Sequence, residues 1–244
     1  MNGKKGDRTM NIVSLSGGKD STAMLLMMLE RNELIHSVVY CDMGEWEFPE
    51  MRTHIEKLQS IMTVPFVRVF PKHDLTYMLT KKPVKRNCKV YRYGNNWPSA
   101  QRRWCTSEKV ATINRYIKKI SCDYTVCIGY ACDEQKRNKP KENYRYPLIE
   151  YGVAENEALQ YCYGKGFDYD GLYNIFNRLS CFCCPLQRIS ELRKLRKVYP
   201  SLWRNMLEWD SKIDTRFGVG FKGYKTVHCI DKRFAEEERQ LSLF

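Results

Sequence analysis

The stretch Asn11-Ile-Val-Ser-Leu-Ser-Gly-Gly-Lys-Asp-Ser21 decides the fold of this 244-residue chain. Its first five residues form a short β-rich run, and a helical pattern extends from Ser21 to Arg31 after the glycines. Two glycines allow a tight turn whose N–H groups, together with the helix N-terminus and a lysine, attract an anion. The lysine is not followed directly by Ser or Thr, so the stretch is not a Walker A loop. The residues predicted to bind phosphate are Ser16, Gly17, Gly18, Lys19, Asp20 and Ser21. The alternative is a simple strand-to-helix turn capped by Asp20 or Ser21.

Strand-like and helical stretches alternate along most of the remaining chain. Further strands are predicted at 36–42, 65–70, 124–130 and 146–151, and helices at 49–62 and 107–120. Such alternation is typical of parallel βαβ units. We therefore expect an α/β fold with a doubly wound, mainly parallel five-stranded sheet. The stretch 81–104 is interpreted as an irregular excursion.

The strand pattern stops after residue 165. Two helical patterns follow, at 190–199 and 202–213. We therefore expect two parts: a nucleotide-binding α/β domain over 1–165 and an α-rich C-terminal region over 166–244.

The composition is that of a globular protein, with 43% hydrophobic and 13% aromatic residues. The longest purely apolar stretch, Ala23 to Leu29, is far shorter than the roughly 20 residues of a membrane span. The first residues show no apolar core of a signal peptide. We therefore expect a cytoplasmic protein with no membrane partner.

The charge balance is strongly basic, with 41 Lys and Arg against 28 Asp and Glu, a net charge of +13. A field of this sign attracts polyanions such as nucleotides and nucleic acid. The excess is concentrated in 81–92 and 188–197, among other stretches, and these two are where we would place a polyanionic acceptor. The alternative is a solvated basic surface.

Three further motifs accompany the phosphate loop: Asp42-Met-Gly-Glu-Trp-Glu-Phe-Pro-Glu50, Arg103-Trp-Cys-Thr106 followed by Lys109, and Gly129-Tyr-Ala-Cys-Asp-Glu-Gln-Lys-Arg137. With them the chain resembles the PP-loop ATP pyrophosphatase (adenine nucleotide alpha hydrolase-like) superfamily, and within it the phosphoadenosine phosphosulfate (PAPS) reductase-like family. The resemblance implies an enzyme that splits ATP into AMP and pyrophosphate. Sulfonucleotide reductases of this family have lost the SGGKDS signature, which is intact here and favours ATP cleavage.

Fixed cations and Mg²⁺ suit this chemistry, because negative charge develops on the leaving pyrophosphate. Lys19 is the first candidate cation, and Asp20 can orient Mg²⁺ or a water. Asp42 lies where a strand ends, a usual place for a ligand contact. The resemblance implies that Lys109 and Arg137 close on the phosphates, with Arg103 as a further candidate. The competing interpretations are a helix N-cap for Asp20, a turn residue for Asp42 and a solvated helix face for Lys109. Asp133 and Glu134 either ligate the metal or pair with basic groups.

Cysteines cluster in the stretch Cys181-Phe-Cys183-Cys184-Pro185, and the whole chain has eleven. In a reducing compartment such a cluster indicates metal ligation rather than disulfides. A mononuclear zinc site or a [4Fe–4S] cluster needs four ligands, so we add Cys105 to Cys181, Cys183 and Cys184, with Cys88 in reserve. The resemblance to PP-loop enzymes of sulfur chemistry favours a [4Fe–4S] cluster over Zn²⁺. Free thiols are the alternative, and one of the adjacent pair could relay sulfur.

Three functions remain in competition. The first is an ATP- and Mg²⁺-dependent adenylyltransferase-type enzyme that activates a nucleic acid or nucleotide for sulfur transfer, with sulfur supplied by a donor protein. The second is a sulfonucleotide reductase acting on PAPS or its unphosphorylated relative. The third is a nucleic-acid-binding module that retains a nucleotide pocket without turnover.

Overall fold

The computed structural model describes residues 10–120, 123–134, 142–179, 181–214 and 220–241. The chain forms two compact units, each built from separate segments. The unit that contains the sheet, here the sheet unit, comprises Met1–Asp42, Phe48–Phe70 and Val110–Leu179. The other, here the helical unit, comprises Met43–Glu47, Pro71–Lys109 and Ser180–Phe244. The boundary predicted at residue 165 divides the chain differently from these units.

The sheet has five strands in the order β3-β2-β1-β6-β7, and every neighbouring pair is parallel. The strands are β1 (Met10–Leu15), β2 (Ile35–Cys41), β3 (Phe66–Val69), β6 (Tyr124–Ile128) and β7 (Tyr144–Arg145). The register places Val13 of β1 beside Val38 of β2 and Cys127 of β6. The predicted doubly wound α/β fold is confirmed.

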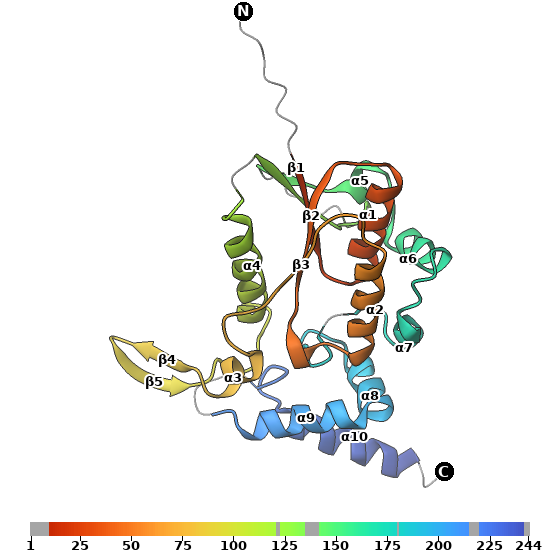
Figure 1. The fold of residues 1–244 in the computed structure, drawn as a ribbon. Coiled ribbons are helices and arrows are strands. Elements are labelled where there is room, and N and C mark those ends of the chain that lie inside the picture. The colour runs from red at the N-terminus through yellow and green to blue at the C-terminus, as the bar shows by residue number, and fades with distance from the viewer. Residues whose placement is uncertain (1–9, 121–122, 135–141, 180, 215–219, 242–244) are drawn as a thin grey trace, which may run out of the picture. The chain divides into compact units, whose positions relative to one another are not determined.

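Helices cover both faces of this sheet (Figure 1). The helices α1 (Lys19–Glu30) and α2 (Pro49–Ser60) lie on one side, and α4 (Trp104–Ile117) lies on the other. Consecutive residues of the central strands, such as Val38 and Val39, are therefore both buried. This explains the nearly continuous apolar runs at these strands, which are typical of parallel sheets covered on both faces.

The strand order reverses at β1, which pairs with β2 on one side and with β6 on the other. The chain leaves β1 through α1 toward β2 and later returns to β6. In open α/β sheets, ligands bind outside the carboxyl ends of the strands at such a switch point. The fold therefore directs attention to the loops that follow β1 and β6.

The fifth strand was predicted at 146–151, and this was wrong. The strand is Tyr144–Arg145, and the predicted segment forms the helix α5 (Pro147–Glu150). Pro147 lacks an N–H for a sheet ladder but suits the first turn of a helix. The sheet unit is completed by α6 (Glu155–Gly164), the 3₁₀ turn η3 (Tyr169–Gly171) and α7 (Leu172–Ile175).

The helical unit contains most of the remaining helices, which confirms an α-rich C-terminal region. Its elements are the 3₁₀ turn η1 (Gly44–Trp46), α3 (Leu75–Thr80), α8 (Ile189–Val198), α9 (Pro200–Ser211) and α10 (Val227–Leu241). Trp46 packs against Trp97 and Trp209 in its core. Buried Asp210 accepts hydrogen bonds from the Trp97 indole (2.8 Å) and from the backbone N–H of Val227 (2.8 Å). This carboxylate thus ties the tryptophan core to the start of α10.

The stretch 81–104 is more regular than predicted. It contains an antiparallel hairpin of β4 (Pro83–Arg86) and β5 (Lys89–Tyr93) and ends at Trp104, the first residue of α4. The two turn residues, Asn87 and Cys88, both have positive φ angles of 49° and 61°. Positive φ at both positions defines the tight turn that matches the twist of paired strands.

Among the described residues, no helix is long and apolar enough to cross a bilayer.

Candidate functional site

The predicted phosphate loop joins β1 to α1 and is closed by its own serines. The hydroxyl of Ser21 accepts a hydrogen bond from the Ser16 N–H (3.1 Å) and lies 2.9 Å from the Ser16 hydroxyl. Gly17 has a φ of +84°, and a Cβ there would come within 2.8 Å of Met51 Cε. The positive φ therefore favours glycine at this position, whereas the flexible Met51 side chain could shift to accommodate a Cβ.

The helix α1 begins at Lys19, and its N-cap residue is Gly18, which provides no side-chain cap. Neither Asp20 nor Ser21 takes the N-cap position, so the alternative of a simple capped turn is wrong. The Lys19 N–H instead donates to the hydroxyl of Tyr173 at 2.9 Å. A helix start without a cap keeps backbone donors and a positive partial charge directed at the loop, as anion binding requires.

Lys19 is held as a fixed cation at the start of α1. The residue is 8% exposed, and its Nζ lies 2.8 Å from Asp20 Oδ1 and 2.9 Å from Glu155 Oε2. Burial alone would lower the pKa of Lys19, but the hydrogen bonds and charges of the two carboxylates outweigh it and raise the pKa. The ammonium group therefore stays charged at neutral pH.

Acidic side chains surround this lysine. Burial raises the pKa of Asp20, the Lys19 ammonium partly offsets that rise, and the charges of Glu155 and Glu134 add to it. Asp133 accepts a hydrogen bond from the Glu155 N–H (3.2 Å), at the first residue of α6. Oxygen donors of this kind are those that Mg²⁺ prefers. Within the described ranges, however, no three His, Cys, Asp or Glu side chains are spaced to hold a metal ion.

A buried polar group supports the loop from behind. The Thr22 hydroxyl donates to the Gly17 carbonyl (3.4 Å) and lies 3.2 Å from His54 Nε2. The His54 ring stacks on Tyr169 with centroids 4.3 Å apart. Burial, assisted by the charge of Lys57, lowers the pKa of His54 to about 4, so the imidazole is neutral.

Gly129, the first residue of the third motif, packs against the backbone of Ser21 at the start of α1. A Cβ on Gly129 would lie 2.8 Å from both the N and Cα atoms of Ser21, so only glycine allows β6 to end this close to α1. Asp42 directly follows β2, and its N–H bonds to the Val69 carbonyl at 3.0 Å. The loop, Asp42 and Gly129 thus follow the carboxyl ends of three adjacent strands.

The remaining predicted phosphate contacts are not tested. Arg137 lies outside the described residues. Arg103 directly precedes α4 and Lys109 lies on it, and both belong to the helical unit. Their roles at the nucleotide therefore stay predictions. Four residues near the loop were not identified from the sequence: Tyr173, Glu155, His54 and Thr22.

The four predicted cysteine ligands all belong to the helical unit. Burial raises the pKa of Cys183, and the nearby thiols of Cys181, Cys184 and Cys105 raise it further. The donor set of four neighbouring thiols suits an iron–sulfur cluster, although the thiols do not reach the spacing of a metal site within the described part of the chain. The reserve ligand Cys88 is exposed in the hairpin turn.

Comparison with known proteins places these features in a family. The model of the phosphoadenosine phosphosulfate reductase domain matches residues 10–187. Two uncharacterized proteins of Methanocaldococcus jannaschii are 26% and 24% identical over 218 and 223 residues, covering 84% and 83% of this chain. The matches cover only 47% and 41% of those proteins, so the chain spans less than half of their length.

Two further matches are a phage protein and a solved structure. An uncharacterized nin region protein of Escherichia phage lambda is 25% identical over 263 residues, covering 95% of this chain and 87% of the phage protein. The solved structure of the U34-tRNA thiolase NcsA from Methanococcus maripaludis, with its [4Fe-4S] cluster, matches with a TM-score of 0.44 and 14% identity. That match covers 93% of this chain and 81% of NcsA.

Proposed function

Because this chain belongs to the phosphoadenosine phosphosulfate reductase domain family, we propose that it is an ATP-dependent adenylating enzyme. In the proposed reaction, an oxygen of the acceptor bonds to the α-phosphorus of ATP while the bond to the bridging oxygen of pyrophosphate breaks. A sulfur nucleophile from a donor protein then replaces the adenylated oxygen and releases AMP. The acceptor is a nucleic acid or nucleotide.

The observation that carries this proposal is the intact loop with buried, charged Lys19 at the uncapped start of α1. Backbone donors of the loop would bind the phosphates, and Lys19 would offset the charge that develops on the leaving pyrophosphate. Interactions that strengthen as this charge develops accelerate the step itself. Lys109 and Arg137 are the proposed cations from the two other motifs, and Asp42 and Arg103 are proposed nucleotide contacts.

The acidic side chains near Lys19 supply oxygen donors for Mg²⁺, and we assign Asp20 to orient it or its water. When bound, Mg²⁺ supplies charge neutralisation at the phosphates. Phosphate binding would also change the partners of Lys19, since its ammonium group is shared by Asp20 and Glu155 in this structure. Glu155 therefore belongs to the proposed site as the group that holds Lys19 before ATP arrives.

The cysteines Cys105, Cys181, Cys183 and Cys184 are the proposed ligands of a [4Fe–4S] cluster, with Zn²⁺ as the second choice. A bound cluster would supply a site for sulfur or electron transfer. A free thiol of the Cys183–Cys184 pair is the alternative sulfur carrier.

The test begins with the anaerobically purified protein, ATP, Mg²⁺ and sulfide as the sulfur nucleophile. AMP and pyrophosphate should form in equal amounts in the presence of a nucleic-acid or nucleotide acceptor, and Lys19→Ala should slow the formation of both. If neither product forms with single-stranded RNA, single-stranded DNA, duplexes or mononucleotides, the adenylation proposal is refuted.

The second candidate function, sulfonucleotide reduction, is favoured by the name of the matching family. The intact SGGKDS loop argues against it, because reduction of PAPS breaks no α–β bond. Release of sulfite from PAPS in the presence of a thiol donor, without ATP consumption, would establish this second function instead.

A further inference from the structure

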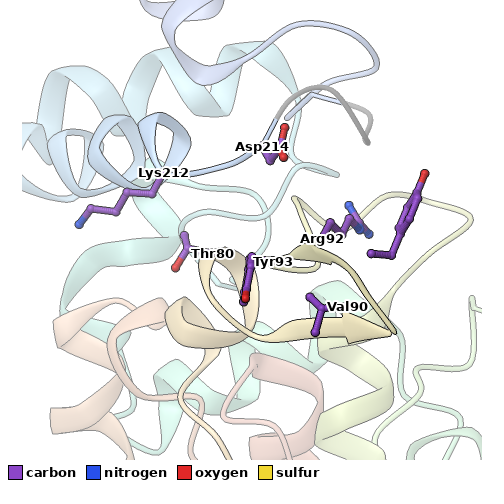
Figure 2. A pocket seen from close by; sticks show the side chains of 7 residues that line it. Thr80, Val90, Arg92, Tyr93, Lys212 and Asp214 are labelled. Carbon is purple, nitrogen blue, oxygen red and sulfur yellow. The ribbon is translucent and has the colours of Figure 1, made fainter. Parts of the chain in front are cut away.

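The β4–β5 hairpin borders a cavity of about 450 Å³ in the helical unit, within the usual size range of ligand pockets. Figure 2 shows Tyr93, Arg92 and Thr80 around this cavity, with Asp214 entering from the segment after α9. The complete lining is Thr80, Val90, Tyr91, Arg92, Tyr93, Lys212 and Asp214. All of these residues belong to the helical unit, so the cavity is contained within one compact body.

Three exposed cations of the hairpin have no ion-pair partner among the described residues. The stretch 81–104 contains no acidic residue, and its basic residues are Lys81, Lys82, Lys85, Arg86, Lys89, Arg92, Arg102 and Arg103. Lys85, Arg86 and Lys89 are exposed, and none forms an ion pair with another residue that the structure describes. Clustered, unpaired cations attract phosphates.

The other basic stretch, 188–197, is different. There Arg193 pairs with Glu237, Arg196 pairs with Asp231 and Glu238, and Lys194 pairs with Glu191. These ion pairs, made to α10 and within α8, involve three of the five basic side chains of the stretch; Arg188 and Lys197 are the other two. Of the two stretches predicted to bind a polyanion, the structure therefore favours the hairpin.

The hairpin also exposes aromatic rings beside its cations. Tyr91 is 48% exposed and Tyr93 is 60% exposed, and both line the cavity. Nucleobases stack on such rings, and stacking does not depend strongly on base identity. The bases of a duplex are already stacked inside the helix, so only an unpaired base can use a tyrosine ring in this way.

The polar groups of the cavity suit a base better than a phosphate. Arg92 is 7% exposed and points its Nη2 toward the Asn95 carbonyl at 3.4 Å, which fixes a guanidinium group in the wall. Lys212 adds an ammonium group that pairs with Glu208. Thr80 contributes a hydroxyl that donates to the Thr76 carbonyl (2.7 Å), and Asp214 a carboxylate whose charge acts on Arg92. The carboxylate repels phosphate but accepts hydrogen bonds from base amino groups, whereas the exposed lysines outside the cavity attract the backbone.

We propose that the β4–β5 hairpin and its cavity bind an unpaired nucleotide of a single-stranded nucleic acid. The base stacks on Tyr93 within the cavity, and the flanking phosphates lie along Lys85, Arg86 and Lys89. The inference rests on the proposed function, for which it identifies the acceptor as a nucleic acid that offers an unpaired base.

The test measures binding of the full chain to fluorescently labelled oligonucleotides by anisotropy, in the absence of ATP. Single-stranded RNA, single-stranded DNA and the corresponding duplexes are compared, which also separates the two nucleic acids. Tyr93→Ala should weaken single-strand binding by about 5- to 100-fold, the range of one lost base stack, whereas Tyr93→Phe should bind like wild type. Lys89→Ala should reduce the slope of log affinity against log salt by about 0.7.

Matched controls use residues that lie outside the hairpin. Tyr224→Ala removes a tyrosine that is 96% exposed, and Lys118→Ala removes an exposed lysine after α4, so neither should change binding. Single strands containing 4-thiouridine should crosslink to the peptide that contains Tyr91 and Tyr93. Equal loss of affinity in Tyr224→Ala, no loss in Tyr93→Ala, or tighter binding of duplexes would each overturn the inference.

The outcome is independent of ATP cleavage. If Tyr93→Ala loses single-strand binding but wild type forms no AMP with any acceptor, the inference stands and the proposed function fails. If wild type forms AMP and Tyr93→Ala binds and reacts like wild type, the proposed function stands and the inference fails.

Discussion

One buried histidine, His54, should make a defined contribution to the pH dependence of this protein's stability. His54 is 4% exposed, stacked on Tyr169 and in contact with the Thr22 hydroxyl behind the phosphate loop. Its pKa is about 4 in the folded protein and that of an ordinary histidine, about 6.5, in the unfolded chain. Between these values the unfolded chain binds a proton that the folded protein does not, so stability is lost as pH falls below about 6.5.

The magnitude follows from the two pKa values. One unit of difference is worth about 1.4 kcal/mol, so His54 alone should remove about 2 kcal/mol of stability between about pH 7 and about pH 5. Protonation would place a charge on a buried ring that contacts the Thr22 hydroxyl, and the desolvation of that charge is the cause of the loss. Asp168 opposes this loss and Lys57 adds to it.

Equilibrium unfolding in urea at the two pH values measures the effect. Other titrating groups also contribute, so the quantity to compare is the pH-dependent change in wild type minus that in His54→Gln. This difference should be about 2 kcal/mol, whereas exposed His73→Gln should follow wild type. A His54→Gln variant with the same pH dependence as wild type would refute the argument that burial keeps this imidazole neutral.

Three further outcomes are expected. Lys19→Ala should slow pyrophosphate release by about 10²- to 10³-fold, because the developing charge loses its fixed cation. Lys19→Arg should retain part of the rate. An unchanged rate in Lys19→Ala would exclude Lys19 as the cation that offsets this charge. Gly129→Ala should destabilise the fold by about 1–3 kcal/mol in thermal unfolding, because its Cβ meets backbone 2.8 Å away at the start of α1. Gly164→Ala, with nothing within 4 Å, should be neutral or stabilising, and equal effects of the two would contradict the packing argument. Cys181→Ser should remove bound iron and the absorbance near 400 nm from anaerobically purified protein, whereas Cys229→Ser should retain both. A colourless wild-type protein that contains stoichiometric zinc would show that these cysteines form a zinc site and not an iron–sulfur cluster.

The sheet was predictable from the sequence wherever local patterns are long. The strand β1 and the helix α1 flank a Gly-rich turn, and β2 contains the apolar run at 38–41, so both local signals agree with the tertiary fold. β7 was missed because it has two residues, and its existence depends on pairing with β6 rather than on its own pattern. The segment at Pro147 is a short apolar and aromatic run that a strand and a buried helix share, and the proline favours the helix.

The candidate site also contains residues that the sequence identifies and residues that it does not. Gly17 and Lys19 were identified because they belong to the motif of six consecutive residues from Ser16 to Ser21. Tyr173 and Glu155 contact Lys19 across 154 and 136 residues of sequence, and no spacing or composition marks them. His54 lies on a helix face that reads as ordinary amphipathic pattern, so its neutral state could be inferred only from burial.

The alternation of the chain between its two compact units has a consequence for synthesis on the ribosome. The strands β6 and β7 follow β1 and α1 only after residues 71–109 of the helical unit have been made, and the sheet unit is complete only at Leu179. Residues 71–109 of the helical unit must likewise wait for partners made after residue 180. Neither unit can complete itself from a contiguous stretch, so loop closure over long distances must precede the contacts between its segments. The nascent chain therefore exposes apolar strands for much of translation, which predicts slow folding and a strong response to chaperones.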